Sequence, residues 1–481
     1  MNAAVRLAWR KRRVRARKRE RGIALIMVLG AIAVLTVILA EFQDETSTEV
    51  AASLADRDGV VAEYIAKSAV NLARLLVASE PTLRTAITPL FAMLKKKPPQ
   101  LPVWEYSDRI LGAFNDSDGS KDFGSSLGLD MTQGKNLGMP GGRFDLTIVD
   151  EDAKINVNLG ASNDIAHIRL AREIMGLIAP PQFSPLFEQR DSRGQVHDRL
   201  TTCAAILDWA DIDETTFNCD ISSAAQAGSG AVEDAFYQLQ DKPYRRKNAP
   251  YDSLEELHLV RGISDDFWAT FIDPDPSDPK KRVMTVWGQG AVNVNTANAQ
   301  TLLALVCSQA APTTEICNDP AQAATFLTGV TMARGITMGA PLFGSAQDFV
   351  NTMKGTGQLG PLLAGLGMKP VKFLSESEFQ KSVTTESKMF SIYADGIVKG
   401  YKRETRTSIR AVVDFRAAPP LTALGLPAGT GTGTGTTTGT PTTAGAGAGS
   451  QQINAAGNTA GSLAAAMQPS TGGQVIYYRV E

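Results

Sequence analysis

The sequence predicts an α+β protein with a long N-terminal transmembrane helix, a sheet, and a large inserted α-helical domain between the strands of that sheet. Three observations predict this fold. Residues 23–40 form an uncharged apolar run, residues 143–150 and 388–415 alternate apolar and polar side chains, and helical periodicity dominates between about 160 and 370. The chain has 481 residues, 43% hydrophobic and 20% charged, a composition that excludes a wholly disordered chain.

Positive charge is concentrated at the N-terminus. Residues 1–21 contain ten Lys and Arg residues and one acid, so the rest of the chain has 38 basic and 49 acidic residues and a net charge of −11. Binding to nucleic-acid phosphates requires clustered Lys and Arg. This balance therefore disfavours a uniformly basic nucleic-acid binder.

The apolar run from Ile23 to Ala40 is interrupted only by Gly30 and Thr36. Its eighteen residues would cover about 27 Å as a helix, which is enough to cross a bilayer core. The preceding positive charges favour a cytoplasmic N-terminus. A cleaved signal peptide is disfavoured because the run is longer than the usual ~7–15 residues and no small-x-small site closes it. A buried core helix is also disfavoured by the flanking charges.

The helix is predicted to continue beyond the membrane as far as Val77. No proline occurs between Glu41 and Pro81, and Gly59 is the only glycine in that stretch. One apolar stripe is formed by Val50, Leu54, Val61, Ile65, Leu72 and Leu76. A rod of about 80 Å follows, with its distal half docked on a globular head.

An ordered set of segments resembles the K-type minor pseudopilins of type II secretion (the general secretion pathway protein K family), in the type IV pilin-like superfamily. Arg-Gly at 21–22 precedes Ile-Ala-Leu-Ile, as in prepilins. The other matching segments are DEDAKINVNLG (150–160), AAILDWADIDET (204–215), AVEDAFY (231–237), PYDSLEELHLVRGIS (250–264), AVNVNTANAQTLLALV (291–306) and PLFGSAQDFV (341–350). The similarity covers most of residues 20–415 and implies a pilin-like antiparallel sheet.

The resemblance implies proteolytic processing of the N-terminus. A prepilin peptidase would cleave between Gly22 and Ile23 and methylate the new terminus. Most members have Glu at the fifth mature position, which is Met27 here. An uncharged residue there is what the resemblance predicts for the K type, which has no subunit above it. An unpaired carboxylate in lipid would be costly.

The resemblance also implies a domain order. The parts are a basic prepilin leader peptide (1–22), a transmembrane and amphipathic helix (23–80), the first part of a pilin-like domain (81–160), an inserted α-helical domain with SAM-like or helix-hairpin-helix-like units (161–375), pilin-like strands (376–416), a low-complexity Gly/Thr/Ala linker (417–473) and a terminal strand (474–481). The linker composition cannot bury a core.

The function implied by the resemblance is mechanical. The chain would form the tip of the periplasmic pseudopilus and help to initiate its assembly for export of folded proteins across the outer membrane. Its partners would be the I, J and H types of minor pseudopilin, the major pseudopilin and the prepilin peptidase. It would be a single-pass inner-membrane protein with a cytoplasmic N-terminus and most of the chain in the periplasm.

An acidic tract around Trp209 is the best candidate for a metal site. Calcium prefers six to eight oxygen ligands, which alternating loop positions can supply. The tract is not an EF-hand, because the glycine and glutamate of that loop are missing. A solvated acidic loop is the plain alternative. K-type pseudopilins carry calcium in this domain, so the resemblance implies a site at Asp211, Asp213, Glu233 and Asp234.

The four cysteines form two near pairs, Cys203/Cys219 and Cys307/Cys317. All lie in the part placed outside the membrane, where disulfides are stable. Of three possible connectivities, the local one within each couple is favoured. A zinc site is the alternative, but no C-x₂-C spacing occurs and the three histidines are remote in sequence.

The sequence has features of two other classes of protein. SLEELHLVRGI (253–263) and NTANAQTLLAL (295–305) resemble helix-hairpin-helix units, which makes a membrane-anchored DNA-binding or uptake protein the alternative. The only compact basic patch nearby is Lys242, Arg245, Arg246 and Lys247. An enzyme is not expected, because hydrolase, metalloprotease and P-loop motifs are absent and Gly355, Gly357 and Gly360 match a dinucleotide pattern by letters only.

Overall fold

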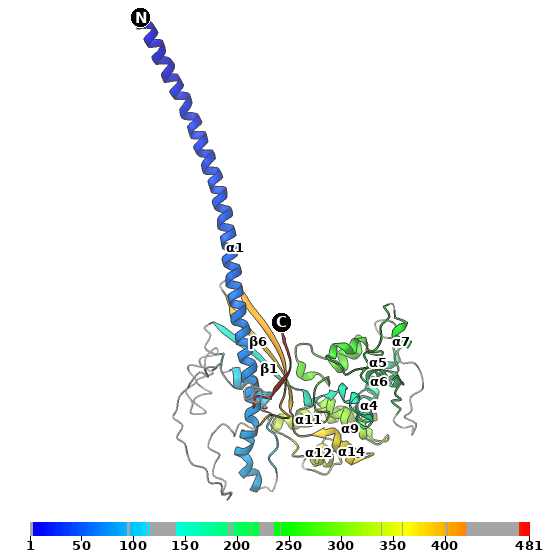
Figure 1. Cartoon of the computed structure of the whole chain (residues 1–481). Coiled ribbons are helices and arrows are strands. Elements are labelled where there is room, and N and C mark those ends of the chain that lie inside the picture. The colour runs from blue at the N-terminus through cyan, green and yellow to red at the C-terminus, as the bar shows by residue number, and fades with distance from the viewer. Residues whose placement is uncertain are drawn as a thin grey trace, which may run out of the picture.

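The computed structural model describes residues 3–93, 97–112, 114–115, 141–190, 194, 196–212, 214–220, 235–240, 242–337, 339–357, 359–400, 403–419 and 471–481. It confirms the predicted α+β class. A single long helix, α1 (Ala3–Met93), stands on a head made of a four-stranded antiparallel sheet and a helical insert (Figure 1).

The membrane-distal part of α1 is longer than the sequence predicts. The helix ends at Met93 instead of Val77 and contains Pro81 and Pro89. Proline removes one backbone donor. In this part of the helix Arg84 lies 2.9 Å from Glu80, one turn earlier, and 2.8 Å from Glu386, so the extension is tied to the segment that leaves the insert.

The sheet has the order β1-β6-β7-β8. Strands β1 (Gly142–Asp150) and β6 (Met389–Lys399) pair antiparallel although the insert separates them in sequence. Strand β7 (Glu404–Asp414) returns next to β6, and β8 (Gln474–Val480) closes the sheet beside β7. Burial alternates along the first half of β1, β6 at the centre of the sheet is buried on both faces, and β8 at the edge is mostly exposed.

Alpha-helix α1 covers one face of the sheet and is packed closely against β6. Gly396 makes this approach possible, because a Cβ at that position would collide with the backbone of Ala62. The buried face of α1 is rich in small residues: Ala62, Ile65, Ala66, Ala69, Val70, Ala73 and Val77. Of the predicted stripe only Ile65 is fully buried, while Val50 is 54% exposed. Val61, Leu72 and Leu76 are partly buried against the same core, so the predicted stripe is docked from Val61 onward, together with alanines that the stripe did not include.

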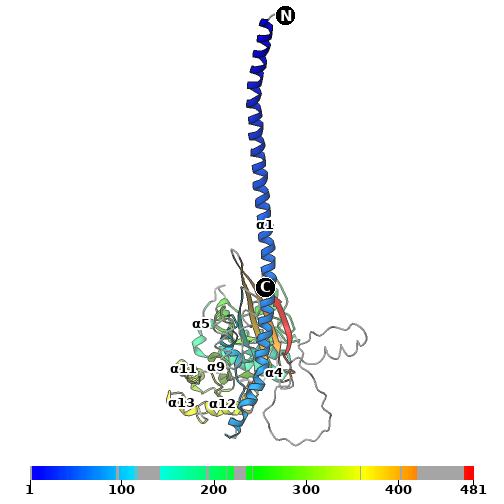
Figure 2. The same cartoon turned by 90° about the vertical axis from the view of Figure 1, so that its left-hand side faces the viewer.

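The insert lies against the other face of the sheet. Tyr477 of β8 and Trp287 of the insert have ring centroids 5.9 Å apart, and Arg410 of β7 lies over the rings of Tyr393 and Tyr477 on this face. The molecule therefore has three layers, which are α1, the sheet and the insert. Figure 2 shows β8 in red at the sheet edge, beside α1.

The insert is mainly helical and has two hydrophobic cores. Its helices are α4 (Asp164–Ile178), α5 (Pro185–Glu188), α6 (Arg199–Asp208), α7 (Ala235–Gln238), α8 (Asp265–Phe267), α9 (Ala299–Gln309), α10 (Glu315–Asn318), α11 (Pro320–Ile336), α12 (Ala346–Met353), α13 (Gly360–Gly365) and α14 (Glu376–Ser382). Helices α4 and α9 cross where Gly176 meets the backbone of Ala304 and Ser308, so only glycine fits there. Short α2 (Ser107–Gly112) lies outside the insert, at the free side of β1.

Four two-residue strands hold the insert to the chain segments that enter and leave it. Strand β2 (Ile155–Asn156) pairs with β3 (Met284–Thr285), and β5 (Val383–Thr384) pairs with β4 (Val292–Asn293). The segment that enters the insert and the segment that leaves it are thus both bonded to the same stretch of the insert, residues 284–293.

Candidate functional site

The first candidate site is the exposed apolar segment of α1, residues 23–42. Its large apolar side chains are between 52% exposed (Ile32) and 70% exposed (Ile26). Its most apolar window has a mean hydropathy of 3.0, and none of that window is buried within the chain. Burial of one such side chain is worth about 1.5–3 kcal/mol. The segment therefore has the length and composition of a single-pass membrane anchor, and it can be covered by lipid or by other helices.

The only hydroxyl in the apolar run is satisfied within the helix itself. Thr36 Oγ1 donates to the carbonyl oxygens of Ile32 and Ala33, at 2.8 and 2.9 Å. Such bonds remove the cost of an unpaired polar group in lipid. The segment can consequently be buried over its whole circumference.

The predicted processing residues lie inside this helix. Gly22 and Ile23 are both helical, and Ile23 is 59% exposed. Met27 is 65% exposed. It stands at the position where most members of the family that the sequence resembles have a glutamate. The sequence prediction of cleavage between Gly22 and Ile23 is not tested by this geometry.

The second candidate site is the junction, defined here as residues 150–154, 284–296 and 383–389, where the chain enters and leaves the insert. Asp152 is its central acceptor and is 1% exposed. Its Oδ2 accepts bonds from the backbone N–H groups of Lys388 (2.7 Å) and Met389 (3.0 Å), and its Oδ1 accepts from Gln289 N (2.7 Å). One carboxylate therefore joins the outgoing chain, the insert and the returning strand.

Asp150 also connects the insert to the segment that leaves it. Its Oδ2 accepts bonds from the hydroxyl groups of Thr296 (2.6 Å) and Ser387 (2.5 Å). Ser387 in turn exchanges two hydrogen bonds with the side-chain amide of Gln100, so the segment after α1 is included as well. The two buried carboxylates thus fix the position of the insert relative to α1 and the sheet.

The protonation of these two acids is shifted by their surroundings. Burial raises the pKa of Asp150 to about 8, and the nearby Asp152 adds to the shift. Burial likewise raises the pKa of Asp152 to about 6, against the lowering effect of its backbone donors. Both shifts arise because a buried site disfavours the charged form of a carboxyl group.

A buried ion pair completes the junction. Lys154 Nζ lies 3.1 Å from Glu151 Oε2, and both side chains are 4% exposed. Burial lowers the pKa of Lys154. Burial alone would raise the pKa of Glu151, but the ammonium of Lys154 and the hydroxyl of Thr285 bring it below its usual value. Removal of one partner would leave an uncompensated buried charge.

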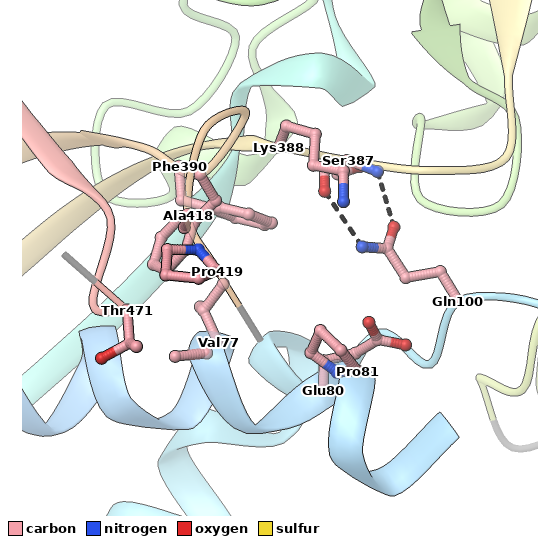
Figure 3. A pocket seen from close by; sticks show the side chains of 12 residues that line it. Val77, Glu80, Pro81, Gln100, Ser387, Lys388, Phe390, Ala418, Pro419 and Thr471 are labelled. Carbon is pink, nitrogen blue, oxygen red and sulfur yellow. Dashed lines mark hydrogen bonds between the residues drawn. The ribbon is translucent and has the colours of Figure 1, made fainter. Parts of the chain in front are cut away.

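A cavity of about 240 Å³ lies beside the junction, between α1 and the sheet (Figure 3). Val77, Phe390 and Phe415 form its apolar side, and Glu80 and Lys388 are its charged residues. Glu80 already accepts bonds from Leu101 N (2.9 Å) and from Arg84. We assign no chemistry to this cavity, because its carboxylate is committed to structural bonds.

The predicted calcium ligands are only partly described. Asp211 follows α6, is 8% exposed, and has its Oδ1 3.7 Å from Arg246 Nη1. Asp213, Glu233 and Asp234 lie outside the described residues. Within the described ranges, no group of three His, Cys, Asp or Glu residues is arranged to hold a metal ion. A buried carboxylate fits calcium chemistry, so the site remains a prediction that depends on this one placed residue.

The neighbouring acid Asp208 has a structural role. Its Oδ1 accepts a bond from Phe217 N at 2.9 Å, and its carbonyl oxygen accepts from Arg246 Nη1 at 2.9 Å. Arg246 therefore holds the end of α6.

Both disulfides have the local connectivity. Cys203 of α6 is joined to Cys219, and Cys307 of α9 is joined to Cys317 of α10. The first bond ties the segment that carries Asp211 to α6. These bonds are suited to an oxidising compartment.

Two of the four cations in the basic patch are already paired. Arg246 is buried beside Asp211, and Lys247 Nζ lies 2.7 Å from Asp252 and 3.0 Å from Glu256. A phosphate-binding surface needs exposed, unpaired cations. The pairing of these two cations thus disfavours the patch as a binding surface for nucleic-acid phosphates.

No model of a known protein family matches the chain, and no curated protein does. One similar solved structure is a chain in "The Crystal Structure of the GspK-GspI-GspJ complex from enterotoxigenic Escherichia coli Type 2 Secretion System". The TM-score is 0.35 at 16% sequence identity, and the match covers 57% of this chain and 76% of that chain.

Proposed function

We propose that this chain is a K-type minor pseudopilin, which forms the tip of a type II secretion pseudopilus and helps to initiate its assembly. The observation that carries the proposal is the structure of α1. Residues 23–54 are exposed throughout, and the following residues of the same helix are buried on the sheet. A helix that is anchored at one end and docked at the other can transfer its apolar half from lipid to a bundle of like helices without unfolding the head.

The proposed location is the inner membrane, with a cytoplasmic N-terminus and a periplasmic head. The ten basic residues before the apolar run support this orientation, because positive flanks stay on the cytoplasmic side. The two disulfides support an oxidising compartment for the head. The exported cargo would be folded proteins, pushed through an outer-membrane channel.

The proposed position at the tip is supported by two features. The insert adds a third layer on the sheet face opposite α1 and would obstruct another subunit there. Met27 supplies no carboxylate to neutralise the terminal amine of a subunit above it. The proposed partners are the I, J and H types of minor pseudopilin and the major pseudopilin, and the proposed processing enzyme is a prepilin peptidase.

The N-terminus of the mature protein tests the proposal. Intact-mass analysis and N-terminal sequencing of the chain purified from its host membrane should find a methylated Ile23 as the first residue. Gly22→Val should block this processing, because a branched side chain would occupy the cleavage position. Gly30→Ala is the matched control and should be processed normally, since a Cβ at Gly30 meets nothing within 4 Å. A mature chain that begins upstream of Ile23 would contradict the proposal.

Calcium binding is part of the proposal. Bound calcium would neutralise Asp211 and the acids near it and cross-link their loops. A ligand that binds only the folded state stabilises it by about 2.7 kcal/mol at 100 times its dissociation constant. The melting temperature should therefore rise with calcium in the unmodified chain and in the control Asp266→Asn, whose side chain is exposed. It should not rise in Asp211→Asn, and a flat titration of the unmodified chain would exclude the site.

A further inference from the structure

The two edge strands of the sheet, β1 and β8, differ in how their outward backbone groups are bonded. At the β1 edge, Asn115 uses its side-chain amide to bond both the carbonyl oxygen and the N–H of Phe144, and α2 lies beside the strand. These contacts occupy the outward backbone groups of β1 at Phe144. At the other edge, no further strand lies beyond β8 among the residues that the structure describes.

The register of β8 shows which of its backbone groups point outward. Ser408 and Glu481 exchange both backbone hydrogen bonds, so this pair is of the hydrogen-bonded type. Antiparallel pairs alternate between bonded and non-bonded types. Val480 and Tyr478, opposite Ile409 and Ala411, are consequently of the non-bonded type and direct their N–H and C=O groups away from β7.

The side chains of the same strand are apolar and exposed. Val475, Ile476, Tyr478 and Val480 are between 37% and 45% exposed. Edge strands usually carry lysine, proline or inward charges that prevent association with another strand. Strand β8 has a single charged residue, Arg479, and this residue is paired with Glu481 at 3.0 Å.

This edge continues the exposed face of α1. Tyr478 is paired with Ala411, a residue of the core between the sheet and α1, so it lies on the α1 side of the sheet. On α1 itself, Lys67 Nζ lies 5.4 Å from the ring centroid of Tyr64. Tyr64 is 57% exposed, and Val60 one turn earlier is 54% exposed. Exposed Val60 and Tyr64 of α1 therefore lie on the same side of the sheet as the apolar edge strand β8.

Two cations beside β8 are already paired within the chain. Lys67 lies 2.6 Å from Glu63, and Arg74 donates to the carbonyl oxygens of Gly472 (2.8 Å) and Gly473 (2.9 Å). Apolar side chains and outward backbone groups are therefore what β8 offers to a partner. Its complement is an uncharged, extended, apolar segment with free backbone groups of its own.

We propose that β8 is a strand-addition site, at which an uncharged extended segment of a neighbouring pseudopilin extends the sheet while its helix packs along α1. This inference rests on the proposed function, because it uses the lateral packing of α1 to bring the neighbour to β8. Main-chain hydrogen bonds supply the affinity in such complexes, and alternate side chains supply the specificity.

Amide exchange within β8 tests the proposal with an internal control. The full chain is compared alone and co-purified in detergent with the I-type and J-type pseudopilins of its host, at single-residue resolution. The outward amides of Val480 and Tyr478 should exchange at least tenfold more slowly in the complex. The amides of Arg479 and Tyr477 are bonded to β7 and should be slow in both samples.

A matched pair of variants distinguishes the contribution of the outward backbone N–H group to binding from that of the side chain. Tyr478→Pro removes the outward N–H without removing a bond to β7, and it should reduce co-purification at least tenfold. Tyr478→Val retains the N–H and should preserve the complex. Melting temperatures of both variants show whether the head is still folded. If the proline variant is unfolded, the exchange measurement on the unmodified chain still tests the proposal.

Four outcomes would overturn the proposal. A complex that leaves Val480 and Tyr478 unprotected would exclude strand addition while leaving the proposed function intact. Protection in the isolated chain that rises with its concentration would show pairing between copies. Protection at every concentration would show that the chain covers the edge itself. Failure of any complex to form would count against the proposed function and, with it, against this site.

Discussion

At the scale of single residues, Asp152 ties the insert to the returning strand through its carboxylate. It accepts three backbone N–H bonds, from Gln289, Lys388 and Met389, which come from the insert and the returning strand. Asp152→Asn would place an amide N–H₂ against some of these donors. Hydrogen bonds to a charged group contribute about 1.5–3 kcal/mol, and unpaired buried donors add a penalty. We expect a loss of about 2–4 kcal/mol in the free energy of unfolding.

The loss at Asp152 can be measured by denaturant unfolding of the full chain in detergent. The matched control is Asp266→Asn, which makes the same chemical change at an exposed position. The control should change the free energy of unfolding by less than about 0.5 kcal/mol. Equal behaviour of the two variants would show that the junction bonds do not stabilise the head.

Asp150 should make the stability of the protein depend on pH. In the folded chain its pKa is raised to about 8 from an ordinary value of 3.8. The folded state therefore binds more protons than the unfolded state between these pH values, and the free energy of unfolding falls as the pH rises. The raised pKa of Asp152, about 6, contributes in the same direction at lower pH.

Asp150→Asn tests this dependence, because the amide stays uncharged at all pH values. The unmodified chain should lose stability between pH 5 and pH 8, and the variant should lose less, by an amount on the order of 4 kcal/mol. Thermal melts at both pH values measure the difference. A variant whose melting temperature follows that of the unmodified chain over this range would exclude a protonated Asp150.

The sequence shows the acids of the junction but not their partners. Residues 150–152 (Asp-Glu-Asp) lie at the end of a predicted strand, and their sequence predicts only the entry to the insert. Their long-range hydrogen-bond donors lie 134–237 residues away in sequence, from Thr285, which bonds to Glu151, to Ser387, which bonds to Asp150. One sequence alone carries no signal for such pairs. The cysteine couples were different, because short spacing by itself favoured the local pairing.

At the scale of elements, Gly396 determines how closely α1 approaches the sheet. A Cβ at this position in β6 would collide with the backbone of Ala62. Gly396→Ala should therefore cost about 1–3 kcal/mol, which is typical of overpacking. The effect should be seen as a lower melting temperature and as faster amide exchange in α1 around Ala62.

Gly59→Ala is the matched control for the helix. A Cβ there meets nothing within 4 Å, and alanine is the better helix former by about 0.8–1.0 kcal/mol. This variant should be slightly stabilised. Destabilisation by both substitutions would mean that the packing of α1 on β6 is not as described.

The elements were predictable to different degrees, for physical reasons. Period-two alternation predicted β1, β6 and β7, although β6 is buried on both faces. The predicted stripe of α1 is docked from Val61 onward, but the alanines that make the closest contacts were not predicted, because hydrophobic patterns do not emphasise them. The extension of α1 to Met93 was missed, since prolines at 81 and 89 signal a helix end in the sequence.

At the scale of the whole molecule, the parts are joined in a series that suits the transmission of force. The apolar segment of α1 continues without a break into the part that is docked on the sheet. The sheet is fixed to the insert by the junction, where two carboxylates, a buried ion pair and four short strands meet. Displacement of α1 along its axis would consequently move the head and the insert together, as the proposed function requires.

The same arrangement predicts that the head folds without the membrane segment. From residue 23 to residue 54 every side chain is exposed, so these residues contribute no burial to the head. A chain that begins at Glu45 should be soluble without detergent and should melt within a few degrees of the full chain. A chain that begins at Asn71 lacks Ala62, Ile65, Ala66 and Ala69, which cover the sheet, and it should not fold. Circular dichroism melts of the two truncated chains measure the difference. If the chain from Glu45 were unfolded, the exposed half of α1 would have to stabilise the head, contrary to the burial pattern. If the chain from Asn71 were folded, the helix would not be needed to cover the sheet.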